Sequence, residues 1–301
     1  MKHAYLILAH KNLNQLKYLI ELLDCKSNDI YIHLDAKWHL TSVELDCLSH
    51  YAKLSSVVLV KRQCISWGDY SIVDAELELI KAGISSGTDY TYFHLLSGMD
   101  MPLKRIELVN KIYEDNIKLM GYPVNYVHFC EDGIQEAIKS RMDAYIFKYK
   151  PSFLISSCFN IMMRIIRKIT VPFKLKKYEY GWGSQWFDIS TELAKDLVEH
   201  QSWIYNNFYK WIIPDEHFLQ TFVNEFGYRN KCYSMNHSEM GYGMIMRKID
   251  FSRGADGRPY VFRKDDFMEL KNSEMCFARK FDETIDEEII DMLRAECLNS
   301  K

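Results

Sequence analysis

The chain lacks most of the short motifs that would place it in a common enzyme class. Its eight cysteines include no Cys-x-x-Cys pair, which argues against a zinc site. It has neither a Gly-x-Gly-x-x-Gly sequence nor a Gly-Lys-Ser/Thr phosphate loop, which disfavours a dehydrogenase or a kinase.

Excess charge of one sign and long apolar runs are also missing. The formal net charge is -3, so nothing in the charge balance attracts nucleic acid, and we expect no nucleic-acid partner. The apolar run 4–9 is too short for a secretory signal or a membrane span. Without a secretory signal, we expect reduced thiols and a cytoplasmic location.

Strand-like and helix-like segments alternate through about residue 125. Short β-branched and aromatic runs predict strands at 4–10, 29–35, 56–60 and from 90 onward, with helices after the first and third of these. This alternation predicts an α/β fold with a mostly parallel, doubly wound sheet and flanking helices. The chain has 301 residues and is 48% apolar, enough for a large core in one domain or two closely joined ones.

The stretch 90–104 places an acid where ligands bind in such sheets. Its strand breaks at Ser97-Gly98 and stops at Pro102, so Asp100 follows the carboxyl end of a strand. Ligands of open α/β sheets bind at that edge. For an isolated Gly-x-Asp sequence, a turn with a capping aspartate is the simpler interpretation.

The middle of the chain is basic and apolar. Between Ala144 and Tyr178 there are eight basic residues and no acidic one. The segment 148–177 carries too many charges for a spanning helix. Two interpretations stay open: a buried helix with a charged edge, or a helix lying on an anionic membrane surface.

Two further segments contain side chains suited to catalysis. Asp215 and Glu216 are expected at the start of a helix, where Asp215 could be its N-cap and Glu216 a general base. In 276–282, Arg279 and Lys280 lie between aromatic residues, a pattern common in surface pairs but also suited to a pyrophosphate. The chain has no Asp-x-Asp metal clamp, so cations would have to take its place.

Six segments, in order along nearly the whole chain, resemble the core-2/I-branching glycosyltransferase family, which includes β-1,6-N-acetylglucosaminyltransferases and peptide O-xylosyltransferases. Each is short, but six in register are specific. The segments are AYLILAH (4–10), YIHLD (31–35), WGDYS (67–71), LLSGMDMPL (95–103), PDEH (214–217) and FARKFD (277–282). The resemblance implies a GT-A-type fold and an inverting, metal-independent transferase that uses a UDP-sugar, with no cofactor.

The resemblance also implies roles for individual residues. Glu216 matches the catalytic base, and Lys280 matches a lysine on the donor diphosphate. Arg258 matches the partner arginine, although Arg263 is an alternative. The remaining donor-side residues are Leu8, Ala9, His10, Asp35, Trp67 and Asp100, and the acceptor side is the predicted strand segment Ser184, Gln185 and Trp186.

We therefore expect one glycosyltransferase domain over 1–301, with a nucleotide-binding half at 1–125 and an acceptor-binding, catalytic half at 126–301. The chain resembles the bacterial branch, so transfer of GlcNAc to a glycan hydroxyl in surface polysaccharide synthesis is expected, on an acceptor that could be lipid-linked. Xylosyl, glucosyl and galactosyl transfer are alternatives. Two alternatives from another class are a non-catalytic sugar-nucleotide-binding protein and a protein peripheral to the inner face of the membrane.

Overall fold

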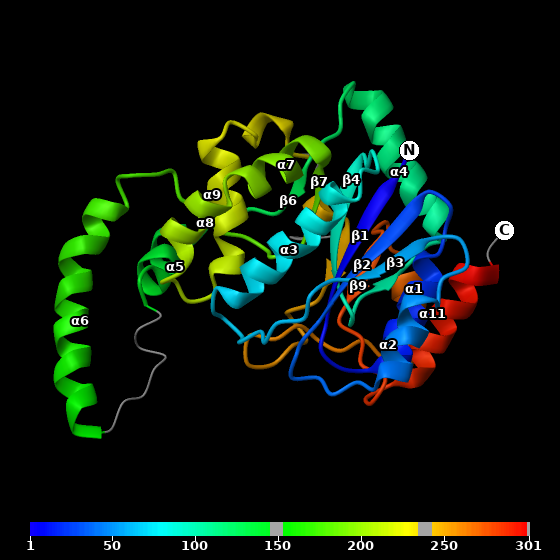
Figure 1. Cartoon of the computed structure of the whole chain (residues 1–301), viewed down its shortest axis with the longest axis horizontal. Helices are drawn as coiled ribbons and strands as arrows, with labels where there is room; N and C mark the ends of the chain where they lie inside the picture. The colour runs from blue at the N-terminus through cyan, green and yellow to red at the C-terminus, as the bar shows by residue number, and fades with distance from the viewer. Residues whose placement is uncertain (145–152, 234–242, 300–301) are drawn as a thin grey trace.

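A mixed six-stranded sheet forms the centre of the computed structural model, which describes residues 1–144, 153–233 and 243–299 (Figure 1). Its strands lie in the order β3-β2-β1-β4-β7-β6. Their bounds are β1 (His3–Ala9), β2 (Asn28–Leu34), β3 (Ser56–Leu59), β4 (Tyr92–Ser97), β6 (Tyr126–Val127) and β7 (Phe187–Ser190).

The first four strands are parallel, as the alternation of strands and helices predicts. β7 runs antiparallel to β4 and to β6, so the sheet is mixed and the expectation of a mostly parallel sheet holds only for its first half. The predicted strand segment 184–186 is wrong, because strand pairing begins only at Phe187. Residues 181–186 form a loop, and the antiparallel direction of β7 brings that loop to the carboxyl edge of β4.

Helices cover both faces of the sheet. Leu6 and Leu8 of β1 pack in one core, while Tyr5 and Ile7 pack in the other, as the period of two in a strand requires. The first core includes α3 (Ser71–Ser85), α5 (Ile134–Arg141), α7 (Thr191–Glu199), α8 (Gln201–Phe208) and α9 (Phe218–Glu225). The second includes α1 (Leu13–Leu23), α2 (Ser42–Ser49) and α4 (Ile106–Met120).

A small three-stranded sheet lies beside the first, in the order β5-β9-β8. It is built from β5 (Met101–Pro102), β8 (Arg247–Ile249) and β9 (Phe277–Arg279). The turn that follows β4 leads directly into β5, and β9 pairs with β5. Residues near the carboxyl terminus therefore lie beside the loop that carries Asp100. A third core packs here with α10 (Phe267–Lys271) and α11 (Glu287–Asn299).

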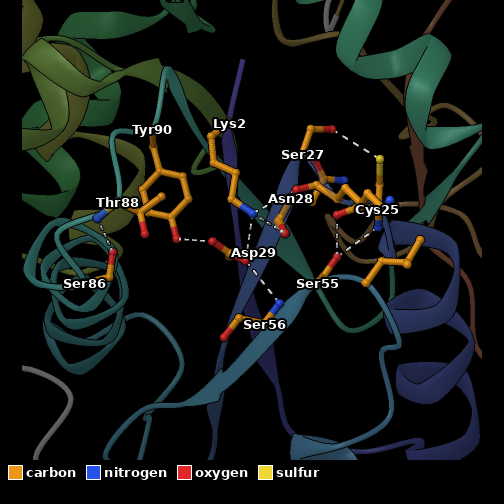
Figure 2. A network of polar contacts seen from close by, with 12 residues as sticks. Lys2, Cys25, Ser27, Asn28, Asp29, Ser55, Ser56, Ser86, Thr88 and Tyr90 are labelled. Atoms are coloured by element: carbon orange, nitrogen blue, oxygen red, sulfur yellow. Dashed lines mark hydrogen bonds and ion pairs between the residues drawn. The ribbon is translucent and has the colours of Figure 1, made fainter.

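A network of polar contacts ties together the amino ends of the parallel strands (Figure 2). The Lys2 ammonium lies 3.1 Å from Asp29 Oδ1 and also donates to the backbone carbonyl of Asn28. The other carboxylate oxygen of Asp29 accepts a 2.6 Å hydrogen bond from the Tyr90 hydroxyl, and Ser56 N donates to Oδ1. Each ion here has its counter-ion at contact distance, which is typical of a stabilising site.

The basic apolar segment contains α6 (Phe153–Lys174), which stands away from the central sheet at the left of Figure 1. None of the helices in the described ranges has the length and hydropathy needed to cross a membrane. The seven cysteines whose side chains are described have free thiols.

Candidate active site

The carboxyl ends of the parallel strands meet where the chain reverses its direction across the sheet. The chain adds β2 and β3 on one side of β1 and then returns to place β4 on the other side. Such a switch point is the usual ligand site of an open α/β sheet. Gly98 allows β1 and β4 to come together here, since a Cβ at this position would lie 3.0 Å from the Cβ of Ala9. Leu8 and Ala9 are buried beneath this edge.

Several cations converge at this edge. Partial burial lowers the pKa of the Lys280 ammonium, and neighbouring positive charges lower it further. Those charges belong to Arg279, Lys11 and Arg258. Partial burial, together with the charges of Lys11 and Lys280, also lowers the pKa of His10. Positive charges gathered around the partly buried Lys280 and His10 form a site that favours an anion.

Two carboxylates lie among these cations. Lys11 Nζ is 2.5 Å from Asp282 Oδ2. Hydrogen bonds from Lys11, Thr284 and Asn12 outweigh the effect of burial and lower the pKa of Asp282. Asp35, which follows β2 directly, accepts from the backbone N of Lys37 at 2.9 Å and has the Lys37 ammonium 3.4 Å away. The carboxylates are fewer than the cations around them.

Arg279 and Asp100 connect the two sheets at this edge. Asp100 closes the turn after β4, with Ser97 N donating to its carboxylate at 3.0 Å. Burial raises the pKa of Asp100, an effect that the charge of Arg279, 3.7 Å away, opposes. The Arg279 guanidinium lies 3.9 Å from the ring centroid of Trp186. With 1% of its surface exposed, Asp100 would act on a bound molecule through Arg279 rather than by direct contact.

Glu216 lies in the short 3₁₀ turn η2 (Pro214–Glu216), and α9 begins only at Phe218. The expected N-cap role of Asp215 is therefore wrong, since His217 precedes α9 and makes no side-chain cap. Arg141 at the end of α5 donates to Glu216 Oε2 at 2.5 Å, and Trp182 Nε1 donates to the same oxygen at 3.2 Å. No described residue donates to Oε1. The side chain is 34% exposed, so Oε1 can receive a proton from a bound molecule.

The adjacent His217 fixes the position of Arg141. Its Nδ1 lies 2.9 Å from the Gly181 carbonyl and its Nε2 lies 3.1 Å from Arg141. Since the guanidinium can only donate, Nε2 is the acceptor and Nδ1 carries the proton. Burial, with the charge of Arg141, lowers the pKa of His217 to about 3, against a weaker raising effect of the Gly181 hydrogen bond. The ring is therefore neutral at physiological pH.

The loop 181–186 links Glu216 to the cations. Trp182 contacts Glu216, and four residues later Trp186 lies under Arg279. Four extended residues span about 14 Å at most, so one short stretch of backbone runs from the carboxylate to the cations. Gly183 N donates to the Glu216 carbonyl at 2.9 Å. Any side chain at Gly183 is excluded, because a Cβ would lie 1.8 Å from the carbonyl oxygen of His128.

A buried acid holds the middle of the same loop. Gln185 donates to Glu76 of α3 at 2.7 Å, and Trp186 N donates to the Ser184 hydroxyl. Complete burial raises the pKa of Glu76 well above its usual range, and the charge of Asp215 raises it further. The buried Glu76 carboxyl thus lies behind both the loop 181–186 and the turn that carries Glu216.

The structure places most of the predicted residues along one edge. His10, Asp35, Asp100 and Lys280 lie at the carboxyl ends of the strands or in β9's extension, and Ser184, Gln185 and Trp186 lie in the connecting loop. Of the two candidate arginines, Arg258 is the one whose charge acts on Lys280. Trp67 is 77% exposed in the loop before α3.

Sequence reasoning missed Arg141 and Trp182, and did not assign Lys11 to the cation cluster. Arg141 reaches Glu216 across 75 positions of the chain, and no local pattern marks it. Lys11 could have been suspected, because it directly follows His10 at the tip of β1. Within the described ranges, no three His, Cys, Asp or Glu side chains gather as a metal site.

Residues 3–259 match the profile of the Core-2/I-Branching enzyme family. The chain belongs to this family. The family that the sequence resemblance implies is thus confirmed. A protein of Ciona intestinalis named "Xylosyltransferase" is similar to it, with 22% identity over 96% of this chain. The chain spans 33% of the length of that relative.

Proposed function

We propose that the protein is an inverting glycosyltransferase of GT-A type that moves a sugar, GlcNAc in the first instance, from a UDP-sugar to a hydroxyl of an acceptor glycan. One observation carries the proposal: the loop 181–186 joins a hydrogen-bonded carboxylate, Glu216, to the cation cluster of Lys280 and Arg279. A general base and a cationic site for the diphosphate, joined by one loop, are the two parts that such a transfer needs.

Glu216 would act as the base. Arg141 and Trp182 hold Oε2, while Oε1 accepts the proton of the acceptor hydroxyl as its oxygen attacks the anomeric carbon. The new C–O bond forms on the face opposite to the departing UDP, so the configuration inverts and no sugar–enzyme bond is needed. Glu216 afterwards releases the proton to water.

The leaving group takes the electrons of the breaking bond. Negative charge then grows on the β-phosphate, and Lys280, Lys11 and Arg258 are the cations positioned to compensate it. Fixed cations supply this stabilisation without reorganisation in the transition state. The missing Asp-x-Asp sequence is the reason that we propose a metal-independent reaction.

The other donor-side residues receive supporting roles. Asp35, next to the cluster, would hold the uridine end, with Leu8, Ala9 and His10 under the nucleotide and Trp67 beside it. Residues 1–125 would supply most of this nucleotide-binding half, and 126–301 the base and the acceptor side. Ser184 to Trp186 would then contact the acceptor, in a pathway that builds surface polysaccharide.

Xylose is a second candidate donor sugar. The only support for it is the name of the similar Ciona intestinalis protein, which matches this chain over a third of its own length. GlcNAc and xylose differ in size and in their polar substituents, so the shape of the pocket decides between them.

The test is a screen of UDP-GlcNAc, UDP-xylose, UDP-glucose and UDP-galactose for thermal stabilisation, followed by a UDP-release assay on the donors that bind. A ligand at 100 times its Kd adds about 2.7 kcal/mol to the free energy of unfolding, which is readily measured. We expect one UDP-sugar to stabilise the protein most. If neither UDP nor any UDP-sugar stabilises it, the proposal is wrong.

A further inference from the structure

The outer face of α6 exposes a row of apolar side chains. Ile169 is 59% exposed and Phe173 is 73% exposed. Among the side chains of α6 that the structure describes, the exposed large apolar ones are Met162, Ile165, Ile166, Ile169 and Phe173. At 3.6 residues per turn these positions fall on one face, which we call the apolar stripe. Apolar side chains gathered on one exposed face are typical of an interaction surface.

The opposite face of α6 is the one that attaches the helix to the body. Val171 is 5% exposed and packs in the first core. Arg167 donates to the backbone carbonyls of Lys139 and Met142, and Lys174 pairs with Asp143. The apolar stripe is therefore not needed to hold α6 in place.

Basic side chains flank the apolar stripe. Lys168, Lys176 and Lys177 are exposed, and no acidic residue occurs between Ala144 and Tyr178. A hollow of about 770 Å³ lies along the helix, and both basic Lys139 and Lys168 and apolar Val171 and Leu175 are among its lining residues. Apolar side chains bordered by lysines are the pattern of a helix that lies in the plane of a membrane.

We propose that α6 docks on an anionic lipid surface, with the apolar stripe in the headgroup region and the flanking lysines against lipid phosphates. The charges favour this occupant over a second copy of the chain. A symmetric dimer through the stripe would bring the lysines of the two copies together, and like charges across an interface repel.

Docking would also place the candidate active site near the bilayer. Arg167 binds the end of α5 through the carbonyls of Lys139, Ser140 and Met142, and α5 ends at Arg141, which contacts Glu216. α6 and the catalytic turn are thus joined by one short helix. This part of the inference rests on the proposed function: it predicts an acceptor glycan carried on a lipid.

Vesicle flotation tests the docking without any assumption about catalysis. The protein is mixed with phosphatidylcholine vesicles in which either none or about one in three of the lipids is phosphatidylglycerol. We expect flotation with the anionic vesicles and loss of it at high salt, because surface charge is screened. Two aspartates in the stripe, Ile169→Asp with Phe173→Asp, should weaken binding at least ~10-fold.

A matched control uses exposed apolar residues elsewhere. Leu119→Asp with Met268→Asp adds the same charge to α4 and α10, where both side chains are exposed, and should leave flotation unchanged. Equal binding to neutral and anionic vesicles, absence of binding, or unchanged binding of the stripe variant would overturn the proposal, as would a salt-resistant dimer in solution. Glu216→Gln should float like the wild type, so a failure of the proposed catalysis leaves this result untouched.

Discussion

The two edges of the parallel sheet carry charge in opposite ways. At the amino edge Lys2 meets Asp29, which also accepts from Tyr90, so each charge is matched by a partner (Figure 2). At the carboxyl edge, burial and then the charges of neighbouring cations lower the pKa of Lys280 and of His10, although Asp282 and Asp35 are present. The same strands thus begin in a matched network and end in an excess of positive charge.

This difference in charge matching indicates that the amino edge contributes to stability and the carboxyl edge to binding. Matched ions in a part-buried network stabilise the fold, since removing one partner leaves the other desolvated without compensation. Cations held near one another without enough counter-ions cost free energy in the unliganded protein and are stabilised by an incoming anion. Variants at the amino edge should therefore change stability, whereas variants at the carboxyl edge should change transfer.

Removing the proposed base should have the largest effect. Glu216→Gln keeps the shape of the side chain and hydrogen bonds but cannot accept the acceptor proton, so we expect the rate of transfer to fall at least ~100-fold. UDP affinity should be nearly unchanged, because the diphosphate site lies at the other end of the loop 181–186. Steady-state rates and UDP titrations measure the two quantities. A turnover like that of the wild type would rule out Glu216 as the base.

The next largest effect is expected at Lys280. Lys280→Ala should lower kcat and raise the donor KM, with a loss of about 2–4 kcal/mol in transition-state stabilisation, by analogy with removal of an oxyanion donor. The melting temperature without ligand should not fall, because the substitution removes a mutually repelling cation. Lys280→Arg should restore only part of the activity, since a planar fork does not replace a compact ammonium.

The alternative at Lys280 is a purely structural role of its aliphatic stem. In that case Lys280→Ala would lower the melting temperature and leave kcat/KM per folded molecule unchanged. Kinetics on the folded fraction, measured beside a melting curve, distinguish the two outcomes.

Acid should lower the free energy of unfolding through His217, which lies beside Glu216 in the candidate active site. Its pKa is lowered to about 3 in the folded state, so the stability that comes from the neutral ring is present above its unfolded value of about 6.5 and is lost as pH falls below it. Between pH 7 and pH 5 this amounts to about 2 kcal/mol. Urea unfolding of the wild type and of His217→Gln at both pH values measures the difference. Equal losses in the two proteins would show that His217 is not the cause.

The smallest effect is expected at the amino edge. Tyr90→Phe removes the hydroxyl that donates to Asp29 and should reduce the free energy of unfolding by about 1–2 kcal/mol. Activity per folded molecule should not change, because this edge faces away from the site. A loss of kcat/KM in the folded fraction would contradict the division between the two edges.

The sequence predicts the parallel half of the fold because its signals there are local. The alternation of buried strands and amphipathic helices identifies β1, β2, β3 and β4, and the carboxyl-edge rule then places His10, Asp35 and Asp100 together. The direction of β7 depends on pairing with β4 across more than ninety positions, which no periodicity reports. For the same reason the strand predicted at 184–186 is a loop in the structure.

The residues of the candidate site also fall into two groups: those in short local motifs and those placed by tertiary packing. Glu216 and Lys280 stand in short recognisable motifs, so a resemblance can name them. Arg141, which holds the carboxylate of Glu216, comes from a helix end with no such motif, and its role depends on tertiary packing. The predicted N-cap role of Asp215 is wrong because Asp215 lies inside a 3₁₀ turn that ends before α9 starts.

Calorimetric titration with UDP in the presence of EDTA tests the central claim that the cations at the carboxyl edge form the diphosphate site. We expect the wild type to bind UDP with chelator present. Lys280→Ala should bind at least ~10-fold more weakly, because a charged contact is lost. Lys2→Ala should bind like the wild type. Binding that requires Mn²⁺, or equal affinity in the wild type and Lys280→Ala, would contradict this claim.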